Sequence, residues 1–174
     1  MSLNRVRLVV LAVASMVGVA GAAAESAPVC SPAMRAALPA LEAGVAAGFP
    51  KALFTKSEYL LNGVCLPKDV VAGTELIDRA AFAGHYLAAV LLAVSYRKGT
   101  WRLPRDPLLA AVWDWIALDY WPDWMDGHDH FYTQVYLPDI AQVDHDQLAT
   151  AYATISMQIR RNIVRLLIPT DPLR

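Results

Sequence analysis

The uncharged run Ala80–Tyr96, AAFAGHYLAAVLLAVSY, constrains the fold most, because none of its residues carries a formal charge at neutral pH. A helix without a charged face is either buried in a protein interior or inserted in a membrane. The run is at the lower limit of length for crossing a bilayer, and Gly84 and His85 dilute its hydrophobicity. We expect a central buried helix and no stable membrane span, with membrane association as the alternative.

The first residues have the three parts of a cleavable export signal. Arg5 and Arg7 precede the apolar stretch Leu8–Val19, and Ala22–Ala24 supplies a cleavage site of small residues. We expect removal of residues 1–24 and export to the periplasm. Residues 25–174, about 150 residues, then form a single domain that is large enough to bury a core.

The charge balance excludes a general nucleic-acid partner. Without Arg5 and Arg7 the chain keeps 13 Lys and Arg against 16 Asp and Glu. A nucleic-acid-binding domain normally carries a basic surface, whereas this chain is mildly acidic.

The only two cysteines, Cys30 and Cys65, both follow the predicted cleavage site. An even pair in an oxidising compartment predicts one disulfide. A reactive thiol is the alternative, but neither cysteine belongs to a C-x-x-C pair. We expect a structural disulfide.

Hydrophobic residues recur with helical spacing in nearly every long segment, and no segment alternates as a strand does. The sequence therefore predicts an all-α, single-domain bundle of about five helices. The expected helices are residues 32–47, with a bend or interruption at Pro39, then 57–61, 74–98, 107–120, and a last one from Asp144 or Asp146 to Pro169.

Local signals place the helix ends. Ser31 with Pro32, and Asp106 with Pro107, are typical of a cap followed by a first turn. Thr74 is the expected cap of the long helix, and Gly99 its end. Pro122 disfavours helix at Trp121.

Motifs of catalysis are missing from the sequence. It contains no G-x-S-x-G, no H-E-x-x-H, no phosphate-binding glycine loop and no second cysteine pair. His85, in the middle of the expected long helix, is interpreted as a hydrogen-bonded core histidine. We expect no enzyme activity, no catalytic residue and no cofactor.

The His/Asp-rich segment 123–146 raises the alternative of a metal site. Asp126, His128, Asp129, His130 and His145 have the donor types that zinc prefers. Their spacing is poor, since His128 and His130 are two residues apart and would lie on nearly opposite sides of a helix. We expect no metal ligand here and no essential structural metal.

The same region is strongly acidic and rich in tryptophan. No Lys or Arg lies between Arg105 and Arg160, whereas this interval contains nine Asp and four of the five Trp. Large aromatic side chains among carboxylates attract a basic partner and anchor it on arrival. Aromatic residues at the edge of the core, capped by solvated Asp, are the alternative. The expected partner-binding residues are Trp115, Trp121, Asp123, Trp124, Asp126 and Asp129.

The segment CLPKDVVAGTELIDRAAFAGHYL, Cys65–Leu87, followed by LPRDPLLAAVWDWIALDYWP, resembles the small periplasmic immunity proteins of the Tai and Rap type. Such proteins protect bacteria from type VI secretion amidases that cleave peptidoglycan. The resemblance rests on the Cys-Leu-Pro turn at Cys65, the Tyr86-Leu87 pair, and the helix from Pro107 that ends at Trp121-Pro122. It covers less than half of the mature chain, and Asp123 replaces an expected cysteine.

The resemblance implies a non-catalytic protein that blocks an effector enzyme. We therefore expect a periplasmic immunity or inhibitor protein whose partner is a basic effector or enzyme. The alternative is a periplasmic metal-binding or envelope accessory protein that uses the segment 123–146. The sequence does not predict the oligomeric state.

Overall fold

The computed structural model describes residues 30–123 and 125–167, and all regular structure in these ranges is helical. The long helices are α1 (Pro32–Ala46), α2 (Pro50–Asn62), α3 (Val70–Phe82), α4 (Tyr86–Lys98), α5 (Pro107–Asp119) and α8 (His145–Leu167). The short elements α6 (His128–Phe131), η1 (Tyr132–Tyr136) and α7 (Leu137–Ile140) connect α5 to α8. The all-α prediction is confirmed, but the expected count of about five helices is too low. The expected leader 1–24, Trp124 and the expected helix end at Pro169 lie outside the described residues.

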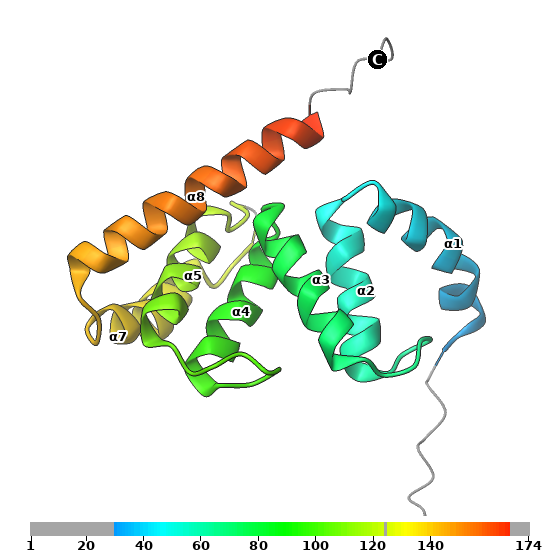
Figure 1. Ribbon diagram of the computed structural model, residues 1–174, viewed down its shortest axis with the longest axis horizontal. Helices are drawn as coiled ribbons and strands as arrows, with labels where there is room; N and C mark the ends of the chain where they lie inside the picture. Colours follow the sequence, from blue (N-terminus) through cyan, green and yellow to red (C-terminus); the bar gives the residue numbers. More distant parts are fainter. Residues whose placement is uncertain (1–29, 124, 168–174) are drawn as a thin grey trace, which may run out of the picture.

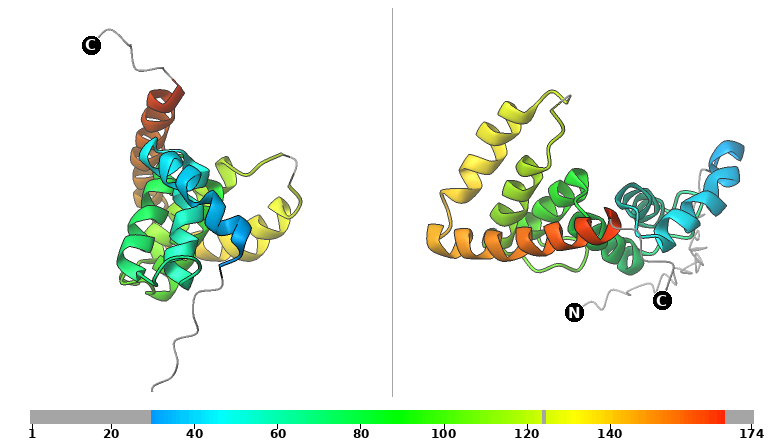
Figure 2. Two further views of the ribbon diagram at one scale, coloured as in Figure 1. Left: turned by 90° about the vertical axis from the view of Figure 1, so that its right-hand side faces the viewer. Right: turned by 90° about the horizontal axis from the view of Figure 1, so that it is seen from above.

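The helices pack mainly against their neighbours in the chain. Helix α2 packs on α3, α3 on α4, and α4 on α5, while α8 returns across α5 and α3 (Figure 1). Helix α1 lies at one end of this row against α2. At the other end, α6, η1 and α7 form a helical arm that projects away from the row (Figure 2).

The expected continuous helix 74–98 is wrong, because the chain breaks at Gly84. Gly84 has φ +86°, a left-handed conformation that glycine adopts without a steric penalty. A Cβ at this position would lie 2.8 Å from Cδ1 of Ile163 in α8. The break therefore lets α8 approach the turn between α3 and α4. Among the described residues, no helix is both long and apolar enough to cross a membrane.

Two further expectations near the N-terminus are corrected. The expected short helix 57–61 is the C-terminal part of α2, which begins at Pro50, a residue whose fixed φ suits the first helical position. Helix α1 continues through Pro39 without interruption. Pro39 is exposed, so water can solvate the carbonyl that has lost its helical donor.

Most of the remaining helix ends follow local signals. The Asp106 carboxylate accepts a hydrogen bond from Leu109 N at 2.9 Å and caps α5 as predicted. Gly99 ends α4 with φ +69°, as predicted. The cap of α3 is Asp69 instead of Thr74, whose hydroxyl lies one turn inside the helix and donates to Val70 O at 2.7 Å.

The core is built from small side chains around a few large ones. Ala88, Ala89 and Ala93 of α4 are almost fully buried, as are Ala111 and Ala117 of α5. Small side chains let the two helix backbones approach closely. The uncharged run is buried only in part, since Leu87 is 38 % exposed. The largest fully buried apolar side chains include Ile77, Leu92, Ile116 and Ile159, and each stabilises the fold by about 1.5–3 kcal/mol.

The predicted disulfide is confirmed. Cys30 and Cys65 are bonded, with 35 residues of sequence separation and a Cα–Cα distance of 4.5 Å. The bond ties the start of α1 to the loop between α2 and α3. Because α1 packs mainly on α2, this covalent link holds the end helix in place.

Candidate functional site

The segment Trp121–Phe131, here called the acid–aromatic loop, joins the end of α5 to the helical arm. Its exposed carboxylates are those of Asp123, Asp126 and Asp129. A hollow of about 360 Å³ lies at its base, lined by Leu118, Asp119, Trp121, Pro122, Asp123, Met125 and His128. Four of the six predicted partner-binding residues therefore lie in this loop: Trp121, Asp123, Asp126 and Asp129.

Trp121 is half-buried and anchored from several sides. Its Nε1 donates a hydrogen bond to Met125 O at 3.1 Å. Its ring lies 5.6 Å from that of Tyr86 and 5.4 Å from that of Phe131, centroid to centroid. This packing holds the indole in one orientation at the wall of the hollow, so its position is set before any partner binds. Trp124, predicted beside it, lies outside the described residues.

Trp115 does not belong to this loop. Its ring stacks on Tyr152 of α8, with centroids 4.2 Å apart and an angle of 14° between planes, and it packs against the core. Trp115 is partly buried and lies apart from the loop, and its role in partner binding stays a prediction. The two-residue offset from Trp113 turns Trp115 toward α8, and helical periodicity alone does not reveal which helix covers that side.

Most of the nine aspartates have local structural partners. Asp106 and Asp144 cap α5 and α8. Asp119 accepts a hydrogen bond from the Tyr152 hydroxyl. Asp114 and Asp139 pair with an arginine from outside the interval. Within the described ranges, Asp123 and Asp126 form no ion pair, and Asp129 has only His128 Nδ1 at 3.5 Å. Asp119, Asp144 and Asp146 are also exposed, so the loop carries three of the six exposed aspartates of the interval.

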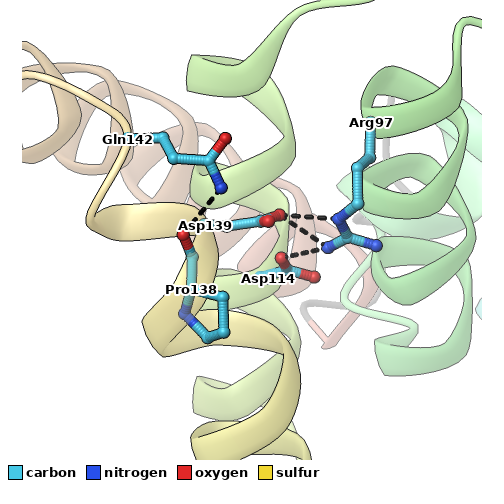
Figure 3. Close-up of polar contacts among 5 residues, drawn as sticks. All are labelled: Arg97, Asp114, Pro138, Asp139 and Gln142. Atoms are coloured by element: carbon cyan, nitrogen blue, oxygen red, sulfur yellow. Dashed lines mark hydrogen bonds and ion pairs between the residues drawn. The ribbon is translucent and has the colours of Figure 1, made fainter.

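A buried ion-pair network fixes the arm that carries the loop. Arg97, near the end of α4, donates from Nη2 to Asp114 Oδ2 at 2.5 Å and from Nε to Asp139 Oδ2 at 2.7 Å. Asp114 belongs to α5 and Asp139 to α7, so one guanidinium joins three elements (Figure 3). Gln142 adds a bond from Nε2 to Pro138 O at 2.8 Å.

The electrostatics of the network are unbalanced, because one cation faces two carboxylates. Burial raises the pKa of Asp114 to about 7 despite the opposing charge of Arg97, and Asp139 adds to the increase. Oδ1 of Asp114 has no hydrogen-bond partner among the described residues. Asp114 is fully buried, so its carboxyl group cannot exchange Arg97 for water.

Sequence analysis missed this network, although one signal was present. Asp114 stands between Trp113 and Trp115 in the apolar stretch LLAAVWDWIAL, and a charged residue in such a stretch requires a partner. Arg97 directly follows the uncharged run. The spacing did not show that the two positions face each other.

His85 differs from its prediction. It caps the start of α4 instead of lying within a helix, and its ring stacks on Phe54 with centroids 4.3 Å apart. Its Nδ1 is buried without a hydrogen-bond partner in the described ranges. Burial and the charge of Lys51 lower the pKa of His85, so the neutral ring is favoured.

The metal alternative receives no geometric support from the described residues. No three His, Cys, Asp or Glu side chains among them converge as a metal site requires. His128 and His130 lie on the single turn of α6, and His145 begins α8.

The loop presents three exposed carboxylates, and one of them, that of Asp123, lies with Asp119 and Trp121 at the lining of the hollow. Comparisons of the chain with protein-family models, with curated proteins and with solved structures found no match.

Proposed function

We propose that this chain is an exported, disulfide-bonded immunity or inhibitor protein that binds a basic, cell-wall-directed effector enzyme through its acid–aromatic loop. The observation that carries the proposal is a loop with three exposed carboxylates, Asp123, Asp126 and Asp129, of which Asp123 lines a hollow walled by Trp121. The resemblance of Cys65–Leu87 and Leu103–Pro122 to Tai and Rap immunity proteins supplies the class of partner.

The chemistry of the hollow suits a Lys or Arg side chain of the partner. Carboxylates raise the rate of encounter with a basic surface, and the effect weakens as salt screens it. A guanidinium or ammonium group over the Trp121 ring adds a cation–π contact of about 0.5–2 kcal/mol. The apolar wall at Leu118 and Met125 excludes water from this contact.

The ion-pair network supports the proposal because it reduces the conformational entropy that the loop loses on binding. Arg97 holds α7 against α4 and α5, and Trp121 is hydrogen-bonded within the loop. A loop that is already ordered loses less conformational freedom when it binds.

The test uses the effector encoded beside the gene for this chain, purified as a peptidoglycan hydrolase. Hydrolysis and association kinetics are measured with the wild type and with a triple variant, Asp123→Asn, Asp126→Asn and Asp129→Asn. We expect the triple variant to inhibit less and to associate at least about tenfold more slowly at low salt.

A matched control removes the same charge elsewhere, by Glu58→Gln, Glu75→Gln and Asp78→Asn on α2 and α3. This control should inhibit like the wild type. Equal losses of inhibition in both triple variants would mean that inhibition depends on net charge and not on the position of the carboxylates. A wild-type protein that neither binds nor inhibits the neighbouring hydrolase would remove the proposed function.

A further inference from the structure

We propose that the outer face of α8 binds the acid–aromatic loop of a second copy of this chain, so that the protein self-associates head to tail. This inference goes beyond the proposed function, although it uses the same loop. The binding surface, here called the basic–apolar stripe, consists of Met157, Arg161, Val164 and Arg165.

The stripe lies on the side of α8 that faces away from the protein. Ile159 is fully buried, and Asn162 donates a hydrogen bond to Phe82 O at 3.0 Å, so these positions mark the inner side of the helix. At 100° per residue, Met157 and Val164 lie on the opposite side. They are 51 % and 52 % exposed, and with Arg160, Arg161 and Arg165 they line an open hollow of about 410 Å³.

The composition of the stripe favours a protein partner. Interfaces are enriched in Met and Arg and depleted in Lys, and the segment 157–167 contains three Arg and no Lys. A membrane surface is a poorer fit, because this segment has no Trp, Tyr or Phe to sit at the headgroup level. Symmetric pairing of two α8 helices would bring the arginines of both copies together, so the partner surface has to be acidic.

The acid–aromatic loop offers such a surface, with three exposed carboxylates beside an aromatic side chain. Asp123, Asp126 and Asp129 can pair with Arg161 and Arg165, while Met157 and Val164 fit the apolar wall of the hollow. One molecule cannot make this contact with itself, because its loop and the outer face of α8 lie on opposite sides of α5 (Figure 2). A contact between two different surfaces propagates from copy to copy unless it closes into a ring.

Sedimentation velocity of the wild-type protein tests the proposal. At low salt we expect the average mass to rise with concentration beyond that of a dimer. The rise should disappear between about 20 mM and about 500 mM salt, as the screening length falls from about 20 Å to about 4 Å. A wild type that stays monomeric at all concentrations and at low salt overturns the proposal.

Two charge-reversed variants identify the surfaces. The stripe variant carries Arg161→Glu and Arg165→Glu, and the loop variant carries Asp123→Lys, Asp126→Lys and Asp129→Lys. Each variant alone should be monomeric, because its loop and its stripe then have the same charge. Mixing the two should restore assembly, since each loop again meets a stripe of opposite charge. A mixture that stays monomeric although the wild type assembles would overturn the proposal.

A matched control, Arg35→Glu with Lys68→Glu, reverses two exposed cations far from α8 and should assemble like the wild type. Equal loss of assembly in this control assigns the effect to net charge and overturns the proposal. So does binding of the wild type to anionic vesicles through Arg161 and Arg165 without self-association. The stripe variant should still bind the effector of the proposed function, which separates a failure of one proposal from a failure of the other.

Discussion

Arg97 Nη2 lies 2.5 Å from Asp114 Oδ2, and this contact joins the end of α4 to the middle of α5 beneath the arm that carries the acid–aromatic loop. The same guanidinium reaches Asp139. The candidate surface therefore depends on a charge cluster that is buried below it.

Removing the cation should strongly destabilise the fold. In Arg97→Met, Asp114 and Asp139 lose the charge that both share, and Asp114 stays buried. Loss of one partner of a buried pair costs about 3–5 kcal/mol, to be measured by denaturant unfolding. The exposed Arg35→Met serves as control and should change stability by less than about 0.5 kcal/mol. An Arg97→Met variant as stable as this control would show that the network contributes nothing to the fold.

The network should also make stability depend on pH. The pKa of Asp114 in the folded protein is raised to about 7, mainly by burial, above its value of 3.8 in the unfolded chain. The folded state therefore holds the proton more tightly, and stability falls as pH rises from about 4 to about 7. Asp114→Asn should reduce this slope, which is measured by denaturant unfolding at several pH values. An unchanged slope in the variant would assign the pH dependence to other acidic groups, such as Glu58 and Asp78, whose pKa values burial also raises. His85 cannot cause such a fall, because its lowered pKa makes stability rise with pH.

Substitution at the break between α3 and α4 should be destabilising for two separable reasons. Gly84→Ala places a Cβ at φ +86° and 2.8 Å from Ile163 Cδ1. We expect a loss of about 1–3 kcal/mol in thermal or chemical unfolding. Gly63→Ala, with φ +68° but no contact closer than 3.4 Å, should lose less. Ile163→Val removes Cδ1. The double variant Gly84→Ala with Ile163→Val should therefore recover part of the stability that is lost through the contact with Ile163.

Replacement of Trp115 should lower the stability of the fold, whereas replacement of Trp121 should lower the affinity for the effector. Trp115→Ala removes the ring stacked on Tyr152 and should cost about 3 kcal/mol or more of stability. Trp121→Ala, at the wall of the hollow, should cost about 2 kcal/mol or more of binding energy for the effector. A melt and a binding measurement on each variant separate the two effects. A reversed result, with binding lost in Trp115→Ala alone, would place the interface on α8.

The disulfide and the expected leader can be checked together. Intact mass of the exported protein should correspond to cleavage after Ala24, with no thiol available for alkylation under denaturing, non-reducing conditions. Replacement of Cys30 and Cys65 by Ser should cost about 4 kcal/mol in the chain-entropy model for a loop of this length. A retained leader, or alkylation of both cysteines, would contradict the expectation.

Local patterns were sufficient for several parts of the fold. Asp106 with Pro107 predicts the start of α5, and Gly99 predicts the end of α4. The disulfide follows from there being two cysteines in an exported chain. These features depend on neighbouring residues or on composition, so no knowledge of distant contacts was needed.

Only the tertiary structure decided the break at Gly84, the place of Trp115 and the partners of the nine aspartates. Glycine within a helical pattern is tolerated, and position 84 requires glycine because Ile163, far along the chain, occupies the space that a Cβ would fill. Arg97 pairs with Asp114 and Asp139 because α4, α5 and α7 pack together, which removes two carboxylates from the acidic surface that the sequence suggests. Periodicity determines which face of a helix is buried, but the contacts between distant segments determine which charges remain exposed on the loop.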